Sequence, residues 1–124
     1  MRRLRTLPLM LSFLAVVGLG LTACAGPEPL TVAANTVIVD VRTPGEYSAG
    51  HLDGAVNVNL QSGSFEQEIA EYPVDGDYIV YCQSGNRSAQ AVSIMESAGF
   101  SNVHDAGAIQ SAADATGIPI VAGN

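Results

Sequence analysis

The chain has 124 residues, enough for one folded domain and a short additional segment. It contains no lysine, and three of its five arginines lie within the first five residues, whereas all twelve acidic residues follow Cys24. The part after Cys24 therefore has a formal net charge of −10, which argues against nucleic acid or an anionic lipid surface as a partner.

Residues 1–23 are typical of an export signal. The three early arginines precede an apolar run over residues 7–21, and the sequence Leu-Thr-Ala-Cys ends at Cys24. This ending resembles the lipobox of bacterial lipoproteins, which implies cleavage before Cys24 and lipid attachment to it. We therefore expect an exported domain tethered to the membrane, in the periplasm or at the outer face of the cell membrane. The alternative is an uncleaved anchor, because the apolar stretch is near the short limit of a membrane span.

Residues 24–35 contain Gly26, Pro27 and Pro29 without a periodic pattern, and are predicted to be a tether. The folded domain is predicted over residues 36–122. If Cys24 carries lipid, Cys82 has no intramolecular disulfide partner. An unpaired cysteine in an exported protein is typical of a reactive thiol.

The first half of the domain begins with a β-branched run over residues 36–42, which predicts a strand buried on both faces. Thr43 to Glu46 has the pattern of a helix start with a capping box, and Gly50 should end this short helix. A turn is expected over residues 51–55, followed by a half-exposed strand over residues 56–60.

The second half repeats the alternation of helix and strand. A second capping box at Ser64 should start a helix that Pro73 ends, and an apolar strand runs from Tyr78 to Cys82. Further elements are a helix over residues 88–98, a short strand over 102–104, a helix over 108–115 and a closing segment over 117–121. The buried side of the longest helix is predicted to contain Ala89, Val92, Met95 and Ala98. Together these elements predict an α/β fold with a largely parallel sheet.

Cys82 lies where the strand leads into a small polar loop and a helix start. Backbone N–H groups of such a loop, together with the helix N-terminus, favour an anion. A thiol in this place should ionise more easily than a free one. The alternative is that Cys82 is a small buried hydrophobic residue, which the polar residues directly after it disfavour.

Two motifs in this order resemble single-domain rhodaneses. Residues 40–57 read DVRTPGEYSAGHLDGAVN and resemble their N-terminal signature, and residues 81–88 read YCQSGNRS and resemble their active-site loop. The resemblance covers nearly all of residues 36–121. It implies a central parallel sheet of about five strands flanked by short helices. It also implies sulfurtransferase chemistry through a cysteine persulfide, with no metal and no bound organic cofactor.

The resemblance implies that the Cys82 thiolate takes sulfur from a small donor such as thiosulfate, and that cyanide or a thiol then removes it. Gly85 would let the loop turn tightly, and Arg87 and Arg42 would attract an anionic donor. Arg87 could alternatively be a solvent-facing residue of the first helical turn. The loop is expected to bind the persulfide through its N–H groups, from Gln83, Ser84, Gly85, Asn86, Arg87 and Ser88.

Three residues of the first motif are interpreted as structural support. Asp40 should bond to Arg42 or to nearby backbone, and Glu46 belongs to the capping box. His51 matches the Gly-His pair of the family and is expected to form a structural hydrogen bond, because a preformed thiolate needs no strong base. His104 has no assigned role and is expected at the surface.

Loop length separates the alternatives. Cys82 and Arg87 are spaced Cys-x4-Arg, whereas related phosphatases and arsenate-reducing relatives have Cys-x5-Arg, with one more residue to surround an oxyanion. The shorter loop favours transfer of a single sulfur atom. A rhodanese-like module that binds a partner or senses oxidants through Cys82 remains the alternative function. One departure is Ala112, where many relatives have tryptophan, which should thin the packing and open one wall of the site.

Overall fold

The computed structural model describes residues 26–124. The predicted export signal and the predicted lipid attachment at Cys24 lie outside these described residues. Within residues 26–124, no helix combines the length and apolar character needed to cross a membrane. Leu30, in the segment predicted as a tether, donates its backbone N–H to the carbonyl of Ala115 at 2.9 Å and packs against the core.

The centre of the domain is a parallel sheet of four strands in the order β3-β1-β4-β5. The prediction of a largely parallel sheet is confirmed, but the sheet has four strands rather than about five. Its strands are β1 (Val37–Asp40), β3 (Val56–Asn57), β4 (Tyr78–Cys82) and β5 (Val103–Ala108). All five residues of β4 are buried, as expected for an apolar strand covered on both faces. Because β1 and β4 run side by side, with Asp40 opposite Tyr81, the polar residues that follow them meet at one edge.

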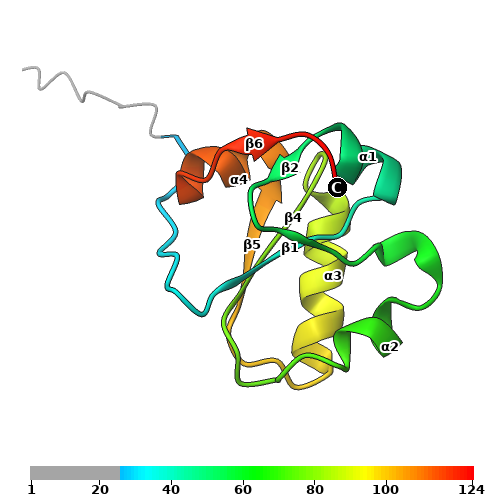
Figure 1. Ribbon diagram of the computed structural model, residues 1–124. Coiled ribbons are helices and arrows are strands. Elements are labelled where there is room, and N and C mark those ends of the chain that lie inside the picture. Colours follow the sequence, from blue (N-terminus) through cyan, green and yellow to red (C-terminus); the bar gives the residue numbers. More distant parts are fainter. Residues whose placement is uncertain (1–25) are drawn as a thin grey trace, which may run out of the picture.

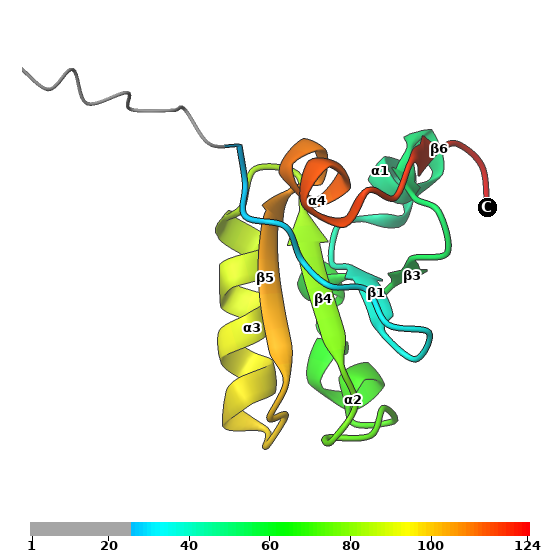
Figure 2. The same cartoon turned by 90° about the vertical axis from the view of Figure 1, so that its left-hand side faces the viewer.

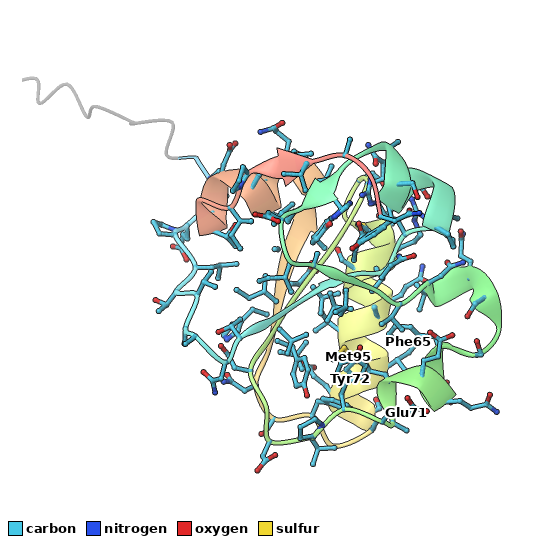
Figure 3. The ribbon with its side chains drawn as sticks, viewed as in Figure 1. Phe65, Glu71, Tyr72 and Met95 are labelled. Carbon is cyan, nitrogen blue, oxygen red and sulfur yellow. The ribbon has the colours of Figure 1, made fainter. Side chains whose placement is uncertain are left out.

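Helices cover both faces of the sheet (Figures 1 and 2). On one face, α2 (Phe65–Ile69) and α3 (Asn86–Ser97) enclose the larger core, and Figure 3 shows Phe65, Tyr72 and Met95 gathered there. On the other face, α4 (Ile109–Thr116) packs through the fully buried Ala112. A short 3-10 turn, η1 (Leu60–Ser62), leads into α2.

A second, two-stranded sheet lies at the same end of the molecule as the carboxyl ends of the parallel strands. It pairs β2 (His51–Leu52) with β6 (Ile120–Val121) in antiparallel fashion. The prediction of a turn over residues 51–55 was therefore wrong for His51 and Leu52, because their partners lie far along the chain. After β6, the N–H of Gly123 donates to the carbonyl of Ser48 at 3.0 Å, which holds the last residues against α1 (Pro44–Ala49).

The two predicted capping boxes differ. At α1 the box is present: the Thr43 hydroxyl accepts the N–H of Glu46, and the Glu46 carboxylate accepts the N–H of Thr43. At α2 the box is absent, because the Ser64 hydroxyl donates to the Glu68 carboxylate at 2.6 Å and caps no N–H.

Candidate active site

Cys82 is the last residue of β4 and is fully buried. The chain then turns at Gly85, whose φ of 101° lies in the left-handed region that favours glycine. This turn directs the N–H of Gly85 back toward the thiol, and it donates to Cys82 Sγ at 2.9 Å. The loop therefore brings one backbone donor onto the sulfur of Cys82.

Ser88 is a second partner of the sulfur. It is buried in the first turn of α3, and the Cys82 thiol donates to its Oγ at 3.5 Å while that hydroxyl donates to the carbonyl of Gly85. Burial raises the pKa of the Cys82 thiol, but it is outweighed by the Ser88 hydroxyl, which can turn to donate to the sulfur once the thiol ionises, and by backbone N–H groups of Ser88, Gly85 and Ser84. The net pKa is below the ordinary value for a thiol. The site thus favours thiolate.

Behind the loop, a buried carboxylate holds Arg42. Both carboxylate oxygens of Asp40 accept from the Arg42 guanidinium, at 2.7–3.1 Å, and one also accepts the backbone N–H of Arg42. Two further N–H groups of Arg42 reach the side chain of Gln83 at 2.8 Å and the carbonyl of Gly50 at 2.6 Å. Arg42 therefore connects β1, α1 and the Cys82 loop, and the expected contact with Asp40 is present.

Tyr81 completes this network, although the sequence interpretation gave it no role. Its hydroxyl donates to Asp40 at 2.7 Å and accepts the N–H of Leu52 at 3.0 Å. Burial, followed by the bond to Asp40, raises the pKa of Tyr81, so it remains a neutral donor. Side chains alternate along a strand, so Tyr81 and Cys82 must point to opposite faces of the sheet. This alternation could have indicated that Tyr81 takes part in contacts on the face away from the thiol.

Arg87 forms a paired contact with Glu46 of α1. The two guanidinium nitrogens of Arg87 donate to the two carboxylate oxygens of Glu46 at 2.8 and 2.9 Å. The pair is partly exposed, with 20% of the Arg87 side chain and 31% of the Glu46 side chain accessible. The Arg87 hydrogen bond lowers the pKa of Glu46 to about 2. The structure thus places Arg87 beside the loop but already engaged by a carboxylate.

The two histidines lie in different environments. His51 is buried, its Nδ1 lies 2.8 Å from the carbonyl of Tyr47, and its ring stacks on the Tyr47 ring with centroids 3.8 Å apart. His104 lies at the exposed surface, 3.6 Å from Asp77. Neither histidine is hydrogen-bonded to the sulfur of Cys82.

An open hollow of about 310 Å³ lies beside the loop. Its walls come from the segment after β1, from α1 and its C-cap, from the Cys82 loop, and from α4 and β6. The lining residues are Arg42, Glu46, Ala49, Gly50, Gln83, Ile109 and Ile120. Ala112 lies one turn further along α4 and is fully buried, so the wall facing the hollow is formed by Ile109 instead. Residues 26–124 contain no cluster of His, Cys, Asp and Glu side chains suited to a metal ion.

Comparison with known proteins shows the family. Residues 30–106 match the model of the rhodanese-like domain, so the chain belongs to this family. It is 35% identical over 92 residues to the thiosulfate sulfurtransferase PspE of Escherichia coli, a match that spans 73% of this chain and 88% of that protein. It is 38% identical over 72 residues to the thiosulfate sulfurtransferase GlpE of Pseudomonas entomophila, which spans 58% of this chain and 64% of that protein.

Solved structures agree with this assignment. A structure described as rhodanese with anions from E. coli has a TM-score of 0.60 and 30% identity, covering 71% of this chain and 99% of its own. A crystal structure of a protein from Anabaena sp. has a TM-score of 0.65 and 26% identity, and the match covers 73% of this chain and 70% of that one. The fold and the relatives support the prediction of a rhodanese-type sulfurtransferase.

Proposed function

We propose that this protein transfers a sulfane sulfur atom through a persulfide on Cys82. The observation that carries the proposal is the bonding of the sulfur: Cys82 is buried at the end of β4, yet the N–H of Gly85 and the hydroxyl of Ser88 lie against it and favour thiolate. The names of the two curated relatives, both thiosulfate sulfurtransferases, support the same chemistry.

In the first half-reaction, the Cys82 thiolate attacks the outer sulfur of thiosulfate. The new S–S bond forms as the bond from that sulfur to the sulfonate breaks, and sulfite leaves with the electron pair. In the second half-reaction, cyanide or a thiolate attacks the outer sulfur and Cys82 leaves as thiolate. Covalent catalysis of this kind gives ping-pong kinetics. The N–H of Gly85 already donates to Cys82 Sγ, and the other N–H groups of the loop would stabilise the anionic outer sulfur of the persulfide.

The state of Arg87 argues against phosphatase or arsenate reductase chemistry. A phosphate-binding loop offers a guanidinium to its oxyanion, whereas the two terminal nitrogens of Arg87 already donate to Glu46. Arg42 is likewise committed to Asp40, Gln83 and Gly50. A site that accepts one sulfur atom needs no such clamp.

The test uses the purified full chain incubated with thiosulfate. We expect a mass gain of one sulfur atom, followed by formation of thiocyanate when cyanide is added. Cys82→Ser should show neither. Ser88→Ala should move the pH midpoint of sulfur loading upward, because it removes a hydrogen bond that lowers the pKa of Cys82. Equal behaviour of wild type and Cys82→Ser would refute the proposal.

We also propose, on the sequence alone, that the protein is exported and tethered to a membrane through a lipid on Cys24. The support is the basic and apolar residues 1–23 followed by Leu-Thr-Ala-Cys. The test is membrane fractionation and mass analysis of the N-terminal peptide, comparing wild type with Cys24→Ala. A wild-type protein that stays unlipidated and off the membrane would refute the tether without touching the Cys82 chemistry.

A further inference from the structure

The hollow beside the Cys82 loop combines apolar side chains with nearby arginines that are each paired with a carboxylate. Ile109, Ile120 and Ala49 form its apolar part, and Ile120 is 42% exposed to solvent. Gln83, which directly follows Cys82, also lines it, so the hollow borders the loop that begins at Cys82, although the thiol itself is fully buried. The location fits the acceptor that removes sulfur from Cys82 in the proposed function.

Neither arginine in this region offers an unpaired charge. Arg42 is almost fully buried and directs its donors to Asp40, Gln83 and Gly50. Arg87 is held by both oxygens of Glu46. With Asp40 and Glu46 offsetting the two guanidinium groups, the anionic sulfur of Cys82 leaves the site with a net negative charge.

The rest of the domain adds to this negative charge. Arg42 and Arg87 are the two cations of residues 26–124, against twelve acidic residues in the same range. Every anion, thiosulfate included, therefore approaches against the negative charge of the site and of the domain, and an acceptor that carries a carboxylate adds this cost to the second half-reaction. The geometry offers such an anion no free guanidinium in compensation. An uncharged apolar group, in contrast, can cover Ile109 and Ile120.

We infer that the site selects thiol acceptors with an apolar body and no added negative charge, and that Glu46 sets this selectivity by neutralising Arg87. The inference rests on the proposed function and specifies its second substrate. The acceptor thiolate attacks the outer sulfur of the Cys82 persulfide, the S–S bond to Cys82 breaks, and Cys82 leaves as thiolate. The products are an alkyl persulfide and the regenerated site, and no oxidant or reductant is consumed.

The test follows the second half-reaction directly. The full chain is loaded with thiosulfate, freed of excess donor, and mixed with 1-propanethiol or 3-mercaptopropionate at equal thiolate concentration. These thiols have the same number of carbon atoms but differ by one carboxylate. Loss of the persulfide, followed by mass, should be about tenfold faster with propanethiol, the size expected for one like charge at several ångströms. Butanethiol should exceed ethanethiol by about fourfold, from two partly buried methylenes.

Variants of the ion pair should change the charge selectivity in opposite directions. Glu46→Gln frees the charge of Arg87 and should bring the propanethiol to mercaptopropionate ratio close to one. Arg87→Gln leaves Glu46 unpaired and should raise the same ratio above that of wild type. A purely structural role of the pair would alter both thiols equally and leave the ratio unchanged, which would overturn the role of Glu46.

Variants of the apolar wall test the preference for acceptors with an apolar body. Ile120→Ser should reduce the preference for butanethiol over ethanethiol toward one. Val74→Ser is the matched control, because Val74 is also exposed, at 47%, but precedes the amino end of β4, whereas Cys82 lies at its carboxyl end. Its thiol preferences should equal those of wild type. Loaded wild type that reacts equally with all four thiols overturns this inference alone, whereas failure of Cys82 to load overturns the proposed function as well.

Discussion

The two arginines beside the Cys82 loop are each paired with a carboxylate, but in contrasting environments. The Arg42 side chain is 4% exposed, its Asp40 partner is fully buried, and the pair has further bonds to Tyr81, Gln83 and Gly50. The pair of Arg87 and Glu46 lies at the surface and joins only α1 and α3. A buried pair cannot lose one member without leaving a charge unsolvated, whereas an exposed one can. The pair of Arg42 and Asp40 is therefore structural, whereas the pair of Arg87 and Glu46 can be mutated to change the charge beside the loop without unfolding the domain.

Removal of Asp40 should have the largest effect. Asp40→Ala leaves the guanidinium of Arg42 buried without a counter-charge, and we expect a loss of about 3–5 kcal/mol in the free energy of unfolding. Urea denaturation measures it. Asp53→Ala, at an exposed carboxylate, is the control and should stay within about 0.5 kcal/mol of wild type. A similar small value for Asp40→Ala would show that the network does not carry the stability assigned to it.

Replacement of Arg42 by lysine should come second. Lysine keeps the charge but cannot reach Asp40, Gln83 and Gly50 together, because it lacks the planar array of donors. We expect Arg42→Lys to cost about 2 kcal/mol, mainly from acceptors left without a partner. The same exchange at the exposed site, Arg87→Lys, should cost less than about 1 kcal/mol. Thermal denaturation of the two variants compares them, and equal costs would remove the distinction between the pairs.

Thr43→Ala should weaken the surface pair indirectly. Thr43 caps α1, and its hydroxyl also donates to Glu46 at 3.0 Å, so the change removes a cap and one anchor of that carboxylate. The expected loss in the free energy of unfolding is about 1 kcal/mol. Ser64→Ala at the start of α2 is the matched control, because Ser64 caps no N–H, and should change stability by less than about 0.5 kcal/mol. Equal losses in chemical denaturation would contradict the difference between the two caps.

Glu46→Gln should have the smallest effect on stability and a distinctive pH dependence. The folded-state pKa of Glu46, about 2, lies below its ordinary value of 4.5, so its contribution is present above pH 4.5 and is lost as the pH falls toward 2. Because the pair is partly exposed, the contribution at pH 7 should be below about 1 kcal/mol. The stability difference between wild type and Glu46→Gln should therefore shrink between pH 5 and pH 3. A difference independent of pH would show that the charge of Glu46 contributes nothing.

Features specified by neighbouring residues were predictable from the sequence. The strands β1 and β4, the cap of α1 and the Cys82 loop follow from short patterns of apolar, capping and turn residues. Contacts between distant segments were not. The Arg87–Glu46 pair and the Tyr81–Asp40 bond each join residues 41 positions apart, and β2 becomes a strand only because β6 lies beside it. Such pairings depend on the tertiary arrangement, which no local pattern records.

The buried side of α3 shows how function can override a periodic pattern. The sequence predicted Ala89, Val92, Met95 and Ala98, whereas Ala89 and Ala98 are exposed. The fully buried residues of α3 are Ser88, Ala91 and Met95. The helix is rotated so that the polar Ser88 faces inward, where its hydroxyl meets the sulfur of Cys82. A pattern of hydrophobic residues alone could not place a buried serine.

The two-residue ladder between β2 and β6 has a consequence for local opening. The wall that contains Glu46 and Gly50 joins the main sheet through few bonds, chiefly Tyr81 to Leu52 and Arg42 to Gly50, and the chain after β6 holds it from outside. Regions with few backbone hydrogen bonds open at a lower free energy than a central strand. We therefore expect amide hydrogen exchange to be fast at Gly123 and slow along β4. The side of the hollow that faces the acceptor can thus loosen while the strand that bears Cys82 stays closed.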